Sequence, residues 1–181
     1  MLVAITGTPG TGKTSVSKIL EKKGYKILDL NTIAKSQGFI IGKDKERNSE
    51  IVDIDKLNKY FDRFKSDETV FIDSHLSHFI SDVDKVILLR GSPDKLKRNL
   101  KAKNWPEKKI KENIESEILD IILSETVEIH DIKDIFEIDT TDYNPGEVAE
   151  KILTIVEQDF KNIKNYKIGK IDWSEEILKD F

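Results

Sequence analysis

Short apolar runs alternate along this chain with segments in which apolar residues recur every three or four positions. Runs of about four to eight apolar residues are typical of buried strands, and the longer spacing is typical of amphipathic helices. The runs predict strands at residues 2–6, 26–30, 69–73, 85–90 and 134–139. The spacing predicts helices at residues 12–23, 32–37, 55 onwards, 93 to a break at 104–106, 107–128 and 145–160. This alternation predicts an α/β fold with a parallel sheet.

Residues that begin or end helices support these boundaries. Gly24 follows the first predicted helix at a C-cap position, and Asn31 can cap the second helix. Ser92 is a suitable cap for a later helix, in which Pro93 would be the first residue. The polar segment between residues 38 and 48 is expected to be a loop.

Composition narrows the class of protein. With 181 residues, 38% of them apolar and 35% charged, the chain can form one domain, residues 1–181, with a lysine-rich tail at residues 161–181. It contains no apolar run near the roughly 18 residues of a membrane-spanning helix and no Cys, and its first residues lead us to expect no secretory leader. We therefore expect a cytoplasmic protein. The net charge of −4 argues against direct nucleic-acid binding and leaves room for a basic protein partner.

The most specific motif directly follows the first predicted strand. Residues 7–14 read GTPGTGKT, a full match to the phosphate-binding pattern G-x-x-x-x-G-K-[ST]. Backbone N–H groups of such a loop surround a phosphate at the start of a helix. Lys13 would reach the β- and γ-phosphates of ATP, and the hydroxyl of Thr14 would bind Mg²⁺. The motif therefore predicts ATP and Mg²⁺ binding.

A carboxylate is expected beside this loop. Asp73 ends an apolar strand, and ligands of parallel sheets lie beyond the carboxyl ends of the strands. Asp73 could hold Mg²⁺ together with Thr14, or it could simply cap a turn. His75 follows two residues later and is a candidate for the site, whereas His78 is expected in a surface loop. The spacing of these histidines does not favour a zinc site.

Arginine is scarce, and phosphoryl transfer favours arginine at the transferring phosphate. Arg90 ends the fourth predicted strand at the expected active-site edge, and Arg98 lies on the helix before the break. Arg47 lies in the polar loop where an acceptor would be held, and Arg63 is expected at the surface. For Arg90 and Arg98 an ordinary surface or strand-end ion pair is the alternative.

The motifs also occur in a recognisable order. They read GTPGTGKTS, IVDIDKL, FIDSHLSH, ILLR and KKIKENIESEILDIILSE. In this order the chain resembles the small adenylate-kinase-like ATPases of the adenylate kinase 6 or CINAP family, whose archaeal members are nucleoside monophosphate (NMP) kinases. The resemblance implies a three-layer α/β/α P-loop fold with five parallel strands. It also implies reversible transfer of phosphate between a nucleoside triphosphate and a monophosphate, ATPase activity, and maturation of the small ribosomal subunit (the 16S rRNA 3′ end) through ribosomal protein uS11.

The resemblance implies site residues at the positions of this chain that match the motifs of the family. The residues implied to bind the ATP phosphates are Gly10, Thr11, Gly12, Lys13, Thr14 and Ser15. Asp73 and His75 would form the D-x-H motif, with an acceptor-binding segment at residues 29–52 and a lid at residues 102–112. The family usually has Arg where this chain has Lys35, Asn99 and Lys103. Lys35, Arg47 and Arg98 are the candidates for binding the monophosphate, and Lys103 for binding ATP.

Three functions remain open from the sequence. The first is a monomeric kinase that transfers the γ-phosphate of ATP to AMP or another monophosphate, with Lys13, Mg²⁺, Arg90 and the lid cations neutralising charge. The second is a P-loop kinase for another small acceptor, such as shikimate or dephospho-coenzyme A. The third is an ATP-switched factor that binds and releases a ribosomal protein.

Overall fold

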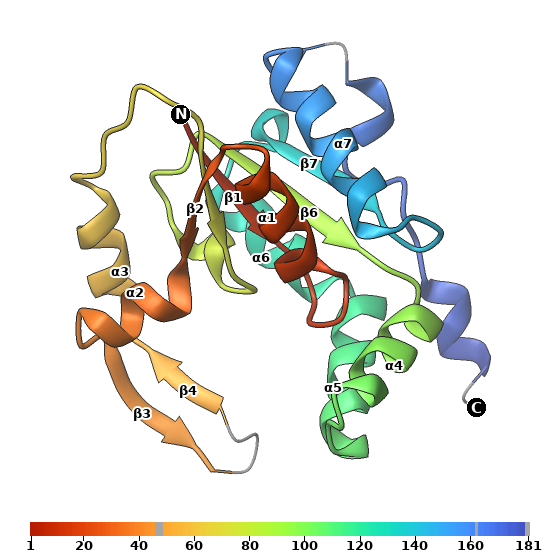
Figure 1. The fold of residues 1–181 in the computed structure, drawn as a ribbon. Helices are drawn as coiled ribbons and strands as arrows, with labels where there is room; N and C mark the ends of the chain where they lie inside the picture. Colours follow the sequence, from red (N-terminus) through yellow and green to blue (C-terminus); the bar gives the residue numbers. More distant parts are fainter. Residues whose placement is uncertain (46–48, 162, 180–181) are drawn as a thin grey trace.

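The apolar runs form one sheet of five parallel strands, and the phosphate-loop strand lies at its centre. The computed structural model describes residues 1–45, 49–161 and 163–179. The strands of this sheet are β1 (Leu2–Thr6), β2 (Lys26–Asp29), β5 (Val70–Asp73), β6 (Lys85–Arg90) and β7 (Ile135–Asp139). Their order in the sheet is β2-β5-β1-β6-β7, and all neighbours run parallel (Figure 1). The carboxyl ends of β1 and β5 therefore meet at one edge.

Helices cover both faces of the sheet. The α-helices are α1 (Lys13–Lys22), α2 (Leu30–Ser36), α3 (Ile54–Phe61), α4 (Pro93–Ala102), α5 (Glu107–Ile118), α6 (Ile121–Ile129) and α7 (Pro145–Glu157). Alternate residues of β1 enter two separate cores, because a parallel strand is buried on both faces. Val3 and Ile5 pack with residues of α1 and α7, while Leu2 packs with Leu57 of α3 and Leu30 of α2. This is the predicted three-layer α/β/α fold.

Helix caps were predicted well in two places and missed in one. The hydroxyl of Ser92 accepts a hydrogen bond from the N–H of Lys95 at 3.3 Å, and Pro93 is the first residue of α4, as predicted. Gly24 has a φ of +96°, the left-handed conformation expected after α1. The prediction of Asn31 as the cap of α2 was wrong. Asp29 caps this helix instead, because its carboxylate accepts from the N–H of Thr32 at 2.7 Å.

The prediction of one long helix at residues 107–128 was also wrong. The segment forms α5 and α6, separated by Asp120, which has a left-handed φ of +53°. No Gly or Pro marks this break in the sequence. Its cause is tertiary, since the guanidinium of Arg90 pairs with the Asp120 carboxylate and also donates to the Glu117 carbonyl oxygen at 3.3 Å.

The expected loop at residues 38–48 contains strands instead. β3 (Ile40–Asp44) pairs with β4 (Ser49–Val52) in an antiparallel hairpin, whose residues 46–48 lie outside the described part of the chain. Exposed and half-buried side chains alternate along β3, and Ile41 and Ile51 are 61% and 46% exposed. The hairpin projects from the sheet on the side opposite α4 and α5 (Figure 1).

The tail packs against the sheet edge. Ile163 is buried in the core with α7, and Lys167 forms an isolated bridge with Phe136 of β7. The helical pattern near the end is a 3₁₀ helix, Ser174–Lys179. Within residues 1–45, 49–161 and 163–179, no helix has the length and apolar character needed to span a membrane.

Candidate functional site

A cleft of about 1040 Å³ opens beyond the carboxyl ends of β1 and β5. This is the position at which ligands bind parallel α/β sheets. Its wall is formed by the phosphate loop, the end of β5, the junction of α4 and α5, part of α6, and the segment before α7. Asp29, Asn31 and Ser49 of the expected acceptor segment also line it. The cleft therefore joins the regions predicted to bind ATP and its acceptor.

The phosphate loop has the backbone geometry that its glycines allow. Gly7 has a φ of +136°, and a Cβ at this position would lie 2.2 Å from the carbonyl oxygen of Leu89. Gly12 has a φ of +104° directly before α1. Both conformations favour glycine. The start of α1 has no side-chain cap, and the N–H of Ser15 donates to the Gly12 carbonyl oxygen at 3.0 Å, which leaves the N–H groups of Lys13 and Thr14 available to a phosphate.

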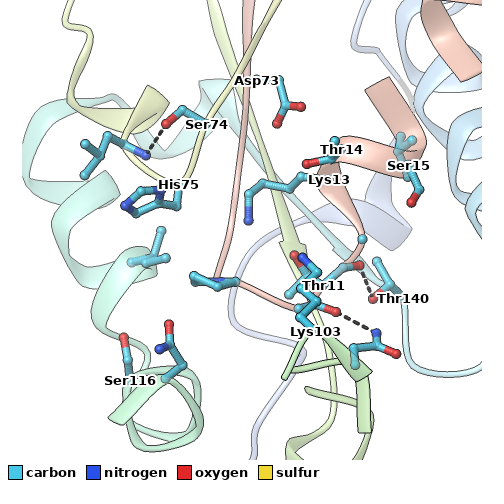
Figure 2. Close-up of a pocket in the computed structure, with 18 of the residues that line it drawn as sticks. Thr11, Lys13, Thr14, Ser15, Asp73, Ser74, His75, Lys103, Ser116 and Thr140 are labelled. Atoms are coloured by element: carbon cyan, nitrogen blue, oxygen red, sulfur yellow. Dashed lines mark hydrogen bonds between the residues drawn. The ribbon is translucent and has the colours of Figure 1, made fainter. Parts of the chain in front are cut away.

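Lys13 points from α1 back toward the loop and into the cleft (Figure 2). Its ammonium donates to the carbonyl oxygen of Gly7 and to that of Thr8 at 3.1 Å. Burial lowers the pKa of Lys13 from 10.5 to about 8, although the carboxylates of Asp73 and Glu117 oppose this change. A phosphate placed here would restore a strong partner for the charge.

Asp73 and Thr14, the expected ligands of Mg²⁺, lie on the same side of the cleft (Figure 2). Burial raises the pKa of Asp73, while the charge of the Lys13 ammonium lowers it. Among the described residues, the Ser17 hydroxyl is buried without a hydrogen-bond partner. These oxygens suit a hydrated Mg²⁺ that takes its other ligands from phosphates. The described residues contain no group of three acidic, His or Cys side chains that could hold a metal without such ligands.

The two histidines of this region differ. His75 lines the cleft beside Lys13, as predicted, and keeps contact with solvent. Desolvation within the cleft and the charges of Lys13 and Lys109 lower its pKa to about 4, so it is neutral at pH 7.

His78 is not in a surface loop, and that prediction was wrong. It lies on the inward-turning 3₁₀ helix Ser77–Phe79, where its ring is buried between Thr6 and Glu125. Nδ1 lies 2.9 Å from the Thr6 hydroxyl, and Nε2 lies 3.1 Å from a Glu125 carboxylate oxygen. Burial lowers the pKa of His78 to about 3. A neutral ring therefore donates from Nε2 to Glu125 and accepts at Nδ1 from Thr6.

The structure contradicts the catalytic role predicted for Arg90. Its side chain is 2% exposed and lies outside the cleft. Nε lies 2.8 Å from Glu117, Nη1 lies 2.6 Å from Glu137, and Nη2 pairs with Asp120. Burial alone would lower the pKa of Arg90, but these carboxylates raise it, so the guanidinium stays charged with its donors occupied. It cannot contact a transferring phosphate in this arrangement.

Two other predicted substrate cations lie away from the cleft. Arg98 is exposed on α4, and its neighbour Asn99 lines the cleft instead, donating to the Gly10 carbonyl oxygen at 2.7 Å. Lys35 is exposed and pairs with Glu50 of the hairpin at 3.0 Å. The remaining candidate, Arg47, lies outside the described residues. Lys103 does line the cleft, as predicted.

Several lining residues were not anticipated. Lys109 enters the cleft, and its ammonium lies 4.3 Å from the centre of the Trp105 ring. Trp105 lies before α5 and Lys109 in its first turn, so no helical spacing in the sequence indicated this contact. Thr140 was also missed. Its hydroxyl contacts the Thr11 carbonyl oxygen at 3.1 Å, a pairing of residues distant in sequence that carries no local pattern.

Comparisons with known proteins agree with this arrangement. A model of the AAA domain family matches residues 3–120. Proteins described as "Putative adenylate kinase" are similar over nearly their whole length. The protein from Thermococcus kodakarensis is 41% identical, with 97% of this chain and 94% of the relative covered. The protein from Methanococcus maripaludis is 37% identical, with 98% of each covered. This chain belongs to their family.

Solved structures support the fold. Shikimate kinase from Acinetobacter baumannii, solved with shikimate, gives a TM-score of 0.60 at 20% identity, covering 90% of this chain and 95% of that one. The YorR protein of Bacillus subtilis, solved with phosphorylated GDP, gives 0.56 at 20% identity, covering 88% and 97%. At such identities the likeness establishes a kinase-type P-loop fold.

Proposed function

We propose that this protein is a nucleoside monophosphate kinase that transfers the γ-phosphate of ATP reversibly to AMP or a related monophosphate. The observation that carries the proposal is the single cleft in which the phosphate loop, Asp73 and residues of the acceptor segment face one another. The names of the relatives support the choice of AMP as acceptor.

Residues of the loop would bind the donor. The N–H groups at the start of α1 and the Lys13 ammonium would hold the β- and γ-phosphates. Thr14 and Asp73 would hold Mg²⁺, directly or through its water, and the Ser17 hydroxyl would accept or donate at that water. The metal ion supplies charge neutralisation on the phosphate oxygens when it is bound. Lys13 would then leave the Gly7 and Thr8 carbonyl oxygens for the phosphate.

Acceptor activation needs no strong base in this site. A monophosphate has a second pKa of about 6, so its attacking oxygen is ionised near pH 7. His75 is neutral there and can offer a hydrogen bond but no charge. With Arg90 and Arg98 outside the cleft, Lys103 and Lys109 are the lid cations that we assign to the transferring phosphate. Catalysis would consist of positioning and charge neutralisation.

A second function belongs to the same site. If water replaces the acceptor, the same donor chemistry is an ATPase reaction. The resemblance implies that this activity serves small-subunit maturation through uS11, and the net charge of −4 suits a basic protein partner. ATP hydrolysis stimulated by added uS11, with every monophosphate left unchanged, would favour this function over the kinase.

The acceptor is identified by testing a panel of candidate acceptors one at a time. Purified protein with MgATP is incubated with AMP, CMP, GMP, UMP, shikimate or no acceptor, and the nucleotide products are separated by chromatography. We expect one monophosphate to be converted to its diphosphate much faster than ATP is hydrolysed alone. Phosphorylation of shikimate alone would assign the cleft to a different class of acceptor.

A further inference from the structure

A carboxylate at the end of α5 contacts the phosphate loop. Glu117 lies at the end of α5 and is 3% exposed. One of its oxygens accepts a hydrogen bond from the Thr8 hydroxyl at 2.5 Å. The other accepts from Nε of Arg90 at 2.8 Å and from the N–H of Gly91 at 3.1 Å. Glu117 therefore bridges the loop and the end of β6.

Arg90 holds this carboxylate from the opposite side and is itself held elsewhere. Its other nitrogens pair with Glu137 of β7 and with Asp120 at the break between α5 and α6. The second oxygen of Glu137 accepts from the N–H of Gly169 in the tail at 2.7 Å. A buried ionic network of this kind adds little net stability compared with apolar side chains of similar size. What the network provides is a fixed geometry for the groups around it.

Thr8, the loop residue that Glu117 holds through its hydroxyl, also contacts Lys13 through its carbonyl oxygen. The Thr8 carbonyl oxygen accepts from the Lys13 ammonium at 3.1 Å, from the Thr11 hydroxyl at 2.9 Å and from the Thr11 N–H at 3.3 Å. Thr8 is fully buried, so its side chain has no solvent to replace the carboxylate. The Glu117 charge also opposes the fall in the pKa of Lys13. A continuous set of contacts thus runs from α5 through Thr8 to Lys13.

We propose that Glu117, held by Arg90, is a positioning residue that fixes Thr8 and so sets the shape of the phosphate loop for ATP. The proposal rests on the proposed function only in taking ATP as the ligand of this loop. Because the contact lies on the donor side, its loss weakens the binding of ATP and leaves the affinity for the monophosphate unchanged.

Two variants interrupt the contact from its two ends. Thr8→Val removes the hydroxyl at nearly constant volume, and Glu117→Gln replaces the carboxylate by an amide of the same shape. Thr8→Ser keeps the hydroxyl and serves as the rescue. Glu115→Gln is the matched control, because Glu115 lies on the same helix with a half-exposed side chain that pairs with Lys111 at 3.7 Å. MgATP affinity is measured by calorimetry, KM values for ATP and AMP by coupled assay, and folding by thermal denaturation.

For Thr8→Val and Glu117→Gln we expect a rise of roughly tenfold or more in the Kd and KM for MgATP, with the KM for AMP unchanged. Thr8→Ser and Glu115→Gln keep wild-type values. The double variant binds MgATP no more weakly than the single variant with the larger loss, because both changes break the same contact between Thr8 and Glu117.

Folded Thr8→Val with unchanged MgATP affinity would overturn the proposal, as would equal losses for ATP and AMP or fully additive losses in the double variant. If Glu117→Gln does not fold, Thr8→Val and Thr8→Ser decide the question. Calorimetry needs no turnover, so a wild-type protein that binds MgATP without phosphorylating any acceptor would refute the kinase function and still allow this test.

Discussion

At the scale of single residues, the unusual acidity of Lys13 has a consequence for ATP binding. Because its pKa is lowered to about 8 by burial, the free protein loses this charge in mildly alkaline solution. A bound phosphate favours the charged form, so the pKa is higher in the complex and binding takes up a proton above pH 8. We expect the Kd for MgATP to be constant between pH 7 and 8 and then to rise about tenfold per pH unit until the pKa of the complex is reached.

Calorimetry of MgATP binding from pH 7 to pH 9.5, in buffers with different heats of ionisation, measures both the affinity and the proton uptake. Lys13→Arg is the control, because a guanidinium stays charged over this range and should give a flat profile. A flat profile in the wild-type protein, with no proton uptake at pH 8.5, would show that the Lys13 ammonium does not titrate there.

A second prediction for a single residue concerns Asp73 and the binding of Mg²⁺. Asp73→Asn keeps the size of the side chain but removes the charge beside Thr14. We expect Mg²⁺-dependent turnover to fall roughly 10- to 100-fold, with a much smaller loss of nucleotide binding in the presence of EDTA. Turnover is measured by coupled assay and binding by titration. Equal losses with and without metal would identify Asp73 as a structural carboxylate.

The sequence predicted the position of residues that lie in local motifs and missed that of residues whose partners are distant in the chain. Lys13 and Asp73 line the cleft because a loop and a strand end place them there. Arg90 also ends a strand, but its carboxylate partners lie 27, 30 and 47 residues further along the chain. No local pattern indicates such a network. Buried His78 was missed for the same reason, because Glu125 reaches it from another helix.

At the scale of helices and strands, the apolar runs were sufficient for the sheet. Each of the five predicted strands is present to within one or two residues, since a parallel strand buried on both faces must be continuously apolar. The helices were less certain at their ends. The break at Asp120 depends on Arg90, and the β3–β4 hairpin has too few apolar residues to be distinguished from a polar loop.

The junction of α4 and α5 is the element for which we predict motion. Lys103 and Trp105 line the cleft at this junction, and the ammonium of Lys109 lies over the Trp105 ring. Closure over bound nucleotides would change the surroundings of this ring. In a Trp173→Phe background, which leaves Trp105 as the one tryptophan of the chain, we expect its fluorescence to change when ATP and AMP bind together.

Substitutions of Lys103 test whether the junction of α4 and α5 supplies positive charge to the transferring phosphate. We expect Lys103→Ala to lower kinase turnover, because a charge near the transferring phosphate is lost, and Lys103→Arg to preserve or raise it. Exposed Lys101, which pairs with Glu107 at 3.0 Å, provides the control Lys101→Ala. Unchanged turnover in Lys103→Ala, with no response of Trp105 to nucleotides, would favour an ATP-switched assembly factor over a kinase with a moving lid.

At the scale of the whole molecule, the central sheet carries two projecting parts. The β3–β4 hairpin extends on one side, and α4 and α5 extend on the other (Figure 1). Residues from both sides line the same cleft of about 1040 Å³, which is slightly above the roughly 300–1,000 Å³ usual for a small-molecule site. A site of this size, with a phosphate loop at its centre, suits two nucleotides that meet phosphate to phosphate.

The stoichiometry of the reaction tests the proposed transfer most directly. Wild-type protein is incubated with MgATP and AMP, and ATP, ADP, AMP and free phosphate are quantified together. We predict two ADP formed for each AMP consumed, little free phosphate, and the reverse reaction from ADP alone. Lys13→Ala should abolish the reaction while keeping the wild-type circular dichroism spectrum. Release of one free phosphate for each ADP, with AMP unchanged, would contradict transfer to a monophosphate.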